Sequence, residues 1–582
     1  MKPAHRGWLA ASLFAVLPAW AQMNMPDQSM AAPVMEMKDQ IPPGQLPPPK
    51  RINGAGTVQM KITGSPRAQM WFNQGLNLLH DYWDYESARA FEQAVRVDPK
   101  CAMCYWGLYK AESFYHSTTM GYAGQALDKA VSLKDGVSRR ERLYIEATAA
   151  LEEGRRHPGG QSMMARPVAI WRDIVKEYPQ DTQARIFLAS SVGGKEALEL
   201  LESVMRDEPD NSAAHHYYIH DLEPTDHPER ALHSAEILGR LAPASGHMVH
   251  MPGHIYFRVG DYASAERAFA ASMEVDTRYM RKQHIAPDDD WNYVHNLMYA
   301  IANLMEEGKF SEATALSAKI GGARGQLDTT LYSNSARDSI SRLNAHLPVS
   351  LRMADWAQTT DLLKGVSPQT RWPHLDFLAR QLADFAAGMQ AVDQHDLAKA
   401  RECSARFDSG LSRMSPGPAP MTMPTMAMPP KIEVMPDAML RSLVSMLSVM
   451  SLELQAALLT AEGKTTDAKP VFAKAAEAER RLGYHEPPNY IRPVGETEGA
   501  AMLAAGDWAD ARAAYQRALV ERPRSGLALY GVAMSSEKAG DTALASREYA
   551  DFLAAWKDAD PTLEELTHAR AYIASGGAGV KR

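Results

Sequence analysis

Small and apolar residues recur every 34 residues through the middle of this chain. Three windows of that length follow one another without a gap, 178–211, 212–245 and 246–279. Position 20 is alanine in each window (Ala197, Ala231 and Ala265), and position 32 is proline in the first two (Pro209 and Pro243). A period of 34 residues is typical of repeats built from two antiparallel helices, so the pattern predicts a stack of helix hairpins.

The same pattern predicts further hairpins on either side of these windows. Residues 68–101 have a glycine at position 8, Gly75, and an aromatic residue at position 24, Phe91. The glycine lets two helices approach closely, and the ring fills the gap between them. Two more contiguous windows, 492–525 and 526–559, carry similar residues near the end of the chain. The sequence therefore predicts an all-α fold, a right-handed α-solenoid of helix–turn–helix repeats.

Changes in composition divide the chain of 582 residues into seven parts. We expect a signal peptide at 1–21, a disordered Met/Pro-rich arm at 22–66, an N-terminal solenoid with a histidine-lined groove at 67–345, degenerate helical repeats at 346–412, a Met/Pro-rich insertion at 413–440, C-terminal repeats at 441–560, and a C-terminal helix with a frayed tail at 561–582. The formal net charge of -8 leaves no basic stripe, so no nucleic-acid partner is expected.

The first 21 residues have the features of a secretory signal peptide. Two basic residues precede an apolar stretch at 8–17, and Ala19-Trp-Ala21 forms a small-x-small cleavage pattern. The apolar stretch is too short to span a membrane, and no later run reaches about 18 uncharged apolar residues. We therefore expect a periplasmic or secreted protein without a membrane span, whose mature chain begins near Gln22.

The repeat positions resemble those of the tetratricopeptide repeat (TPR) family. Four phrases are also similar to a family of exported bacterial TPR proteins of unassigned function: Cys101-Ala-Met-Cys-Tyr-Trp-Gly107, His215-His-Tyr-Tyr-Ile-His220, His247-Met-Val-His-Met-Pro-Gly-His254 and Tyr484-His-Glu-Pro-Pro488. The TPR resemblance implies a concave groove, lined by the first helix of each repeat, that binds a peptide or protein partner. It also implies that positions 2, 5 and 9 of a repeat face this groove.

Histidines occupy these positions in neighbouring repeats. His216 and His220 are at positions 5 and 9 of one window, and His250 and His254 are at positions 5 and 9 of the next. Residues four apart lie on one face of a helix, so each pair predicts a clamp of two nitrogens. Packed helix axes lie about 8–10 Å apart. We therefore expect the two clamps to converge on one metal ion.

Two further histidines, His247 and His295 at position 2 of their repeats, are a fifth and a sixth candidate ligand. An all-imidazole set favours copper or zinc over magnesium or calcium, which prefer oxygen ligands. Neighbours that could orient the rings are Tyr217, Asp221, Glu223 and Tyr256, and a carboxylate from the acidic loop at 288–290 could join the ligands. The alternative is a groove without metal that recognises a carboxylate or changes its charge with pH.

Methionine is unusually frequent, with 32 copies. Met23-Asn-Met25 and Met421-Thr-Met423 lie in segments without apolar periodicity, and they have a spacing that suits thioether ligands of Cu(I). An apolar linker gives the same pattern. Taken with the histidines, the methionines favour copper.

The chain has three cysteines, and two of them, Cys101 and Cys104, form a Cys-x-x-Cys motif at a repeat junction. In an oxidising compartment this spacing predicts a short structural disulfide. Because Cys104 lies in the first turn of a predicted helix, which lowers a thiol pKa, a redox or metal-binding pair is the alternative.

Two classes of function remain open at this point. One is an exported scaffold that binds a peptide or protein in its groove and holds copper or zinc with histidines of adjacent repeats. The alternative is a metal-dependent enzyme, a hydrolase or an oxidoreductase, or a copper-handling protein that uses the same histidines. The sequence contains no phosphate-binding loop, dinucleotide fingerprint or nucleophile elbow, so no nucleotide cofactor is expected.

Overall fold

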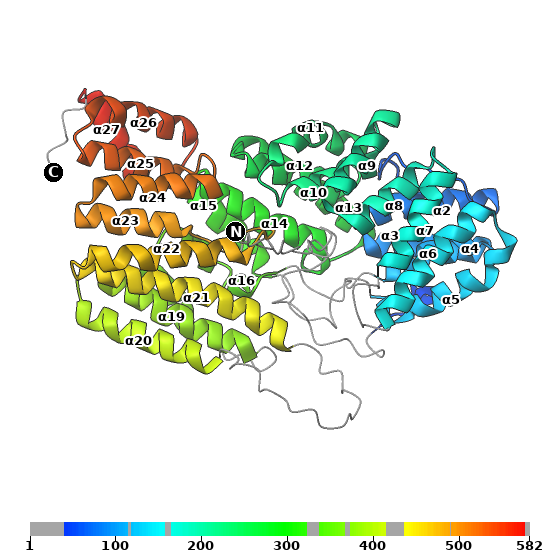
Figure 1. The fold of residues 1–582 in the computed structure, drawn as a ribbon, viewed down its shortest axis with the longest axis horizontal. Coiled ribbons are helices and arrows are strands. Elements are labelled where there is room, and N and C mark those ends of the chain that lie inside the picture. Colours follow the sequence, from blue (N-terminus) through cyan, green and yellow to red (C-terminus); the bar gives the residue numbers. More distant parts are fainter. Residues whose placement is uncertain are drawn as a thin grey trace, which may run out of the picture.

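The computed structural model describes residues 40–113, 118–156, 164–322, 337–366, 373–414, 436–488 and 490–576. Within these ranges the chain forms 26 α-helices and a few 3-10 turns, and it forms no β-strand. Figure 1 shows two stacks of helices, α2–α13 and α19–α27, with α14–α16 between them. The predicted all-α solenoid of TPR type is confirmed.

The bounds of the helices follow the predicted hairpins along the chain. The first half contains α2 (Pro66–His80), α3 (Asp84–Val97), α4 (Ala102–Glu112), α5 (Ala123–Leu133), α6 (Arg139–Arg156), α7 (Ala165–Glu177), α8 (Thr182–Val192), α9 (Gly194–Asp207), α10 (Ser212–Leu222), α11 (Leu232–Leu241), α12 (Gly246–Arg258), α13 (Tyr262–Gln283), α14 (Trp291–Glu306) and α15 (Phe310–Ile320). The second half contains α16 (Ser339–Leu343), α17 (Leu347–Arg352), α18 (Trp356–Lys364), α19 (Pro373–Asp393), α20 (Leu397–Met414), α21 (Pro436–Ala461), α22 (Thr465–Leu482), α23 (Val494–Ala505), α24 (Trp508–Glu521), α25 (Gly526–Lys538), α26 (Thr542–Ala555) and α27 (Glu564–Ala574).

Polar capping residues fix where the histidine-bearing helices begin. Asn211, Ser245 and Asp290 immediately precede α10, α12 and α14, and each side chain accepts a hydrogen bond from the backbone N–H three residues later. Such a cap satisfies an N–H group that has no partner within the helix. Asn211 and Ser245 are 34 residues apart, which is the predicted period.

Two of the predicted windows differ from the observed hairpins. The cap of α8, Asp181, lies 30 residues before Asn211, so window 178–211 begins ahead of its first helix. The spacing is short because one residue, Gly193 with φ +67°, joins α8 directly to α9. In the third window α13 continues to Gln283, because position 32 is Thr277 and not a proline that would end the helix.

A glycine packed against an aromatic ring holds the two helices of several hairpins together. A Cβ added to the glycine would lie 2.9, 2.3 and 2.5 Å from the facing ring in the pairs Gly75–Phe91, Gly253–Phe269 and Gly499–Tyr515. All three rings are buried. The helices therefore approach this closely only where position 8 has no side chain, as the sequence pattern predicts.

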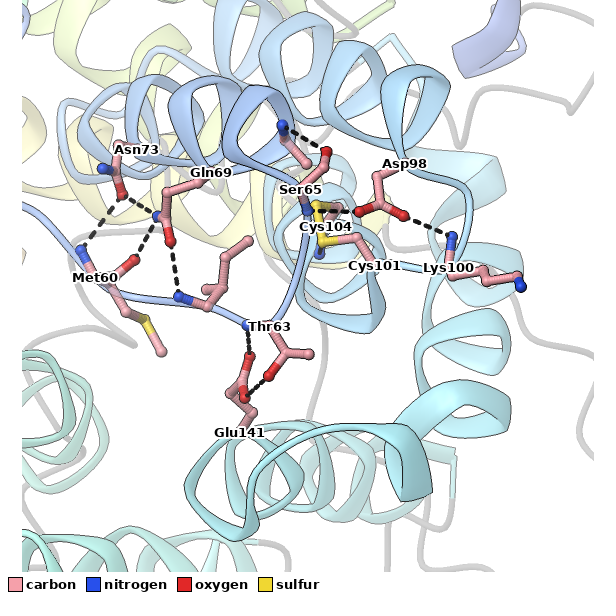
Figure 2. Close-up of a disulfide and its surroundings, with 12 residues drawn as sticks. Met60, Thr63, Ser65, Gln69, Asn73, Asp98, Lys100, Cys101, Cys104 and Glu141 are labelled. Atoms are coloured by element: carbon pink, nitrogen blue, oxygen red, sulfur yellow. Dashed lines mark hydrogen bonds between the residues drawn. A yellow bond between two sulfur atoms is a disulfide. The ribbon is translucent and has the colours of Figure 1, made fainter.

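Residues 40–65 pack along the first hairpin as an irregular segment that includes a 3-10 turn at Pro43–Gln45, so the prediction of a disordered arm is wrong for this part of 22–66. Three alternating side chains, Val58, Met60 and Ile62, are buried. The backbone of Val58 donates to and accepts from the side-chain amide of Asn77, at 2.9 and 2.8 Å. Glu141 likewise accepts from the backbone N–H and the hydroxyl of Thr63 (Figure 2). Side chains of the solenoid thus satisfy a backbone that has no helix of its own.

Cys101 and Cys104 form a disulfide at the start of α4, beneath this extended segment (Figure 2). Both residues are buried. The segment passes close to the bond, since a Cβ added to Gly64 would lie 3.4 Å from the Cys101 sulfur. The disulfide therefore belongs to the packed interior at the junction of two repeats. The third cysteine, Cys403, is free and buried.

The C-terminal hairpins return to pack against α14 and α15. The indole N–H of Trp556, the C-cap residue of α26, donates to the carbonyl of Glu306 at 2.9 Å. The guanidinium of Arg352 in α17 lies fully buried between the carboxylates of Glu306 and Glu496. These contacts join the C-terminal stack to the C-terminal end of α14.

Several predicted segments fall wholly or partly outside the described residues: the signal peptide 1–21, the arm as far as residue 39, the centre of the insertion (415–435) and the tail 577–582. The ends of the predicted insertion are helical, because α20 ends at Met414 and α21 begins at Pro436. Among the described helices, one stretch, Ser442–Ala461 of α21, is long and apolar enough to cross a membrane. In the structure 61% of that stretch is buried, as in the core helix of a packed stack.

Candidate metal centre

The six histidines identified in the sequence lie together in two buried groups. The first group comprises His216 and His220 of α10 with His247 of α12, and the second comprises His250 and His254 of α12 with His295 of α14. Within each group the three candidate ligand atoms lie within 4.8 Å of one another. Each group combines the histidines at repeat positions 5 and 9 of one helix with the histidine at position 2 of the first helix in the next repeat. The single point of convergence that we expected is therefore wrong, because the repeat generates the same triad twice.

In the first group, hydrogen bonds from Nδ1 fix how each ring is turned. His216 Nδ1 lies 2.6 Å from the carbonyl oxygen of His80, and His247 Nδ1 lies 3.2 Å from Oδ1 of Asn292. His220 Nδ1 lies 2.8 Å from Glu223 Oε1. These oxygens can only accept, so we assign the proton of each neutral ring to Nδ1. The three Nε2 atoms are left with lone pairs.

The second group has the same design. His250 Nδ1 donates to Oδ1 of Asn296 at 2.6 Å, and His254 Nδ1 donates to Glu223 Oε2 at 2.6 Å. The amide of Asn296 is itself held, because its Nδ2 donates to the carbonyl of Phe269 at 2.9 Å. The Nε2 atoms of His250 and His254 therefore also carry lone pairs.

These lone pairs point at one another. The two Nε2 atoms of His216 and His247 are 3.1 Å apart, and those of His250 and His254 are 2.5 Å apart. The Nε2 atoms of His220 and His295 are buried and have no hydrogen-bond partner among the residues that the structure describes. Two facing lone pairs repel unless a proton or a cation lies between them.

Protonation is disfavoured at five of the six rings, those of His216, His220, His247, His250 and His295. Burial, followed by the charge of neighbouring histidines, lowers the pKa of His216, His247 and His250 well below the usual value. Burial lowers the pKa of His295 to about 3. The six residues are at most 6% exposed, so water does not replace the missing partners at the surface. A metal cation is the group that this set of nitrogens accepts best, since two imidazoles on a tetrahedral ion at about 2.05 Å lie roughly 3.3 Å apart.

Two histidines beside the groups provide an internal comparison. His80 contacts the Tyr217 hydroxyl through Nδ1 at 3.1 Å and Gln183 Oε1 through Nε2 at 2.8 Å. His215 contacts Ser234 and the carbonyl of Pro209, each at 2.8 Å. Both nitrogens of these buried rings are satisfied by protein groups. The facing nitrogens of the two groups are therefore a local feature and not a general property of buried histidine in this chain.

Two carboxylates lie between the groups. Burial alone would raise the pKa of Glu223, but His254 and His220 outweigh it and hold that pKa well below the usual range. The side chain of Glu486 is 21% exposed, and its Oε2 lies 3.8 Å from both His254 Nδ1 and His295 Nε2. Burial and the nearby charge of Glu223 raise the pKa of Glu486 well above its usual value. Glu223 is thus the carboxylate whose negative charge would balance that of a cation held by the rings.

The face that carries the histidines is covered, so the prediction of an open histidine-lined groove is wrong at this point. The ring of Tyr82, whose φ is +56°, lies 4.9 Å from that of His216, and the ring of Tyr299 lies 4.3 Å from that of His254. The loop after α22 closes the second group, where the hydroxyls of Tyr484 and Tyr299 are 3.1 Å apart. The N-terminal hairpin and this loop fill the space that a peptide would occupy.

Other predicted contributors have different roles. Asp290, in the acidic loop proposed to supply a ligand, accepts a hydrogen bond from the backbone of Tyr293 as the cap of α14. The hydroxyl of Tyr217 contacts Nδ1 of His80, and its ring stacks on that of His216 with 5.5 Å between the centroids. The sequence pattern does not indicate Asn292, Asn296 or Glu486, although Glu486 lies in the phrase Tyr484-His-Glu-Pro-Pro488. The two asparagines are one helix turn apart on α14, and nothing in the sequence around them distinguishes them.

No family model and no curated protein matches the sequence. Among solved structures, the crystal structure of the APC/C hetero-tetramer Cut9–Hcn1 is similar, at 12% identity over 76% of this chain and 85% of that chain, with a TM-score of 0.26. The two chains superpose poorly, so the architecture assigned above depends on the hairpins and caps of this chain alone.

Proposed function

We propose that this protein is an exported metal-binding solenoid that holds copper or zinc in its two histidine groups. The observation that carries the proposal is the pair of facing Nε2 atoms in each group, with every Nδ1 that fixes them bound to an acceptor. Imidazole nitrogen suits copper and zinc better than it suits magnesium or calcium. Export is inferred from the signal-peptide pattern of residues 1–21.

Two groups with three ligands each support a capacity of two ions per chain. Three protein ligands leave a fourth position free for water or another molecule, which is also the arrangement of catalytic metal sites. A metal-dependent hydrolase or oxidoreductase therefore stays the alternative function. The methionine clusters favour copper over zinc on grounds of ligand softness alone.

Binding of a peptide or protein partner stays a prediction for the remaining surface of the solenoid. Stacked helix hairpins offer extended surfaces of the kind that bind proteins. The stretch that carries the histidines is excluded from such binding, because its side chains are buried under Tyr82 and the loop at Tyr484.

Metal titration of protein prepared without a histidine tag tests the proposal. Chelator-treated protein is titrated with Zn²⁺, and separately with Cu⁺ under anaerobic conditions, and bound metal is measured by elemental analysis. We expect two equivalents for the wild type and one for His216→Ala/His247→Ala, since this pair belongs to one group. His250→Ala/His295→Ala should likewise retain one equivalent.

Two control variants separate specific ligands from histidines in general. His233→Ala removes a side chain that is 76% exposed, and His215→Asn alters a buried ring whose nitrogens are both satisfied. Both should bind two equivalents. Wild-type protein that binds no transition metal, or paired variants that keep both ions, would exclude the proposal.

A further inference from the structure

Glu223 occupies a rigid position at the end of α10, between the two histidine groups. It is the C-cap residue of the helix, and its backbone N–H donates to Ile219. Its carbonyl oxygen accepts from the guanidinium of Arg258 in α12 at 2.9 Å. Its side chain is fully buried. The backbone of Glu223 is thus held between α10 and α12, the helices that supply five of the six histidines.

Each oxygen of this carboxylate serves a different group. Oε1 accepts from His220 Nδ1 of the first group at 2.8 Å, and Oε2 accepts from His254 Nδ1 of the second at 2.6 Å. An ionised carboxylate has two equivalent acceptors, so it can fix the tautomer of both rings at once. A side-chain amide has one acceptor and one donor, and it could fix only one of them.

The other orienting residues each serve a single group. Asn292 contacts His247 in the first group, and Asn296 contacts His250 in the second. Both are buried asparagines of α14, one helix turn apart, and both hold an Nδ1–H of α12. They are therefore matched controls for a residue that serves both groups.

We propose that Glu223 is a shared positioning residue that couples the two metal sites, an inference that depends on the proposed function. A cation on Nε2 of His220 polarises its Nδ1–H and draws charge from Glu223. The same carboxylate then supports His254 less strongly, so the second ion binds more weakly than the first. The chain should fill in two separate steps and not as two independent, equal sites.

Metal affinities of four full-length proteins test this inference: wild type, Glu223→Ala, Asn292→Ala and Asn296→Ala. Zn²⁺ is titrated against a competing chelator to obtain both dissociation constants, and Co²⁺ is used as a spectroscopic probe of the ligand geometry. We expect Glu223→Ala to weaken both sites about 10–100-fold, the usual effect of removing a residue that orients a ligand. Asn292→Ala and Asn296→Ala should each weaken one site and leave the other within about twofold.

Glu223→Gln provides a second reading in case the alanine variant folds poorly. Its single acceptor should preserve one site with the wild-type Co²⁺ spectrum and weaken the other. Circular dichroism of each variant without metal checks that the helices are intact. If Glu223→Ala and Glu223→Gln leave both affinities unchanged while the wild type binds two ions, the coupling inference is wrong and the proposed function stands. If the wild type binds no metal, the proposed function itself fails.

Discussion

The N-terminal and C-terminal repeats place different side chains at the same position of the hairpin. Position 5 is His216 or His250 in the repeats that contain α10 and α12, and it is Glu496 in the repeat that contains α23. All three side chains are buried on the first helix of their hairpin. Their environments differ, because both carboxylate oxygens of Glu496 accept hydrogen bonds from Arg352, whereas Nε2 of His216 and of His250 each face another histidine Nε2.

The partner of Glu496 is Arg352, which is fully buried. Its guanidinium donates to Glu496 at 2.5 and 2.9 Å, to Glu306 at 2.9 and 3.1 Å, and to the hydroxyl of Ser525 at 3.0 Å. The positive charge that the C-terminal site requires is thus encoded in the chain. The comparison shows that the same solenoid position becomes structural where the chain supplies the cation, and becomes a candidate ligand site where it does not.

The largest change in the free energy of unfolding is expected when metal is added, because metal should act on the histidine groups of the N-terminal region. Saturating each histidine group with free Zn²⁺ at about 1,000 times its dissociation constant should raise the free energy of unfolding by about 4 kcal/mol for each ion. Denaturant titration with and without metal measures this gain. His216→Ala/His250→Ala should abolish most of the gain, whereas a full gain in that variant would place the metal elsewhere.

The next largest change is expected when the buried ion pairs of the C-terminal site are removed. Arg352→Met removes the cation and leaves Glu306 and Glu496 buried without it, which should cost about 3–5 kcal/mol of unfolding free energy. The same denaturant titration measures the loss, while metal stoichiometry should stay at two. As a control, Lys364→Ala removes an exposed partner of Asp361 and should change nothing measurable. Loss of metal binding in Arg352→Met would show that the two regions are not independent.

The smallest change in stability is expected when the glycine at position 8 of a repeat is replaced, and each region offers one such glycine for comparison. Gly253→Ala and Gly499→Ala each push a Cβ against an aromatic ring, at 2.3 Å from Phe269 and 2.5 Å from Tyr515. Each should lose about 1–3 kcal/mol of stability through overpacking. Gly253 lies on α12 between His250 and His254, so its variant should also weaken metal binding, whereas Gly499→Ala should not. Equal metal affinities in the two variants would contradict the local character of the site.

Much of the fold could be predicted because its signals are local. The 34-residue period, the glycine–aromatic pairs and the caps at Asn211 and Ser245 each act within one hairpin. The extended segment at 58–62 was missed because its alternating pattern is short. Its backbone is satisfied by side chains such as Asn77 and Glu141, whose role appears only after the helices are packed.

The sequence by itself determined which helices carry histidines and that positions 5, 9 and 2 recur in neighbouring repeats. Only the tertiary structure decided that these six rings form two groups, and which nitrogen is left without a proton in five of them. The reason is that a tautomer is set by the partner of Nδ1. Those partners come from the carbonyl of His80 in α2, from Asn292 and Asn296 in α14, and from one carboxylate shared between two helices.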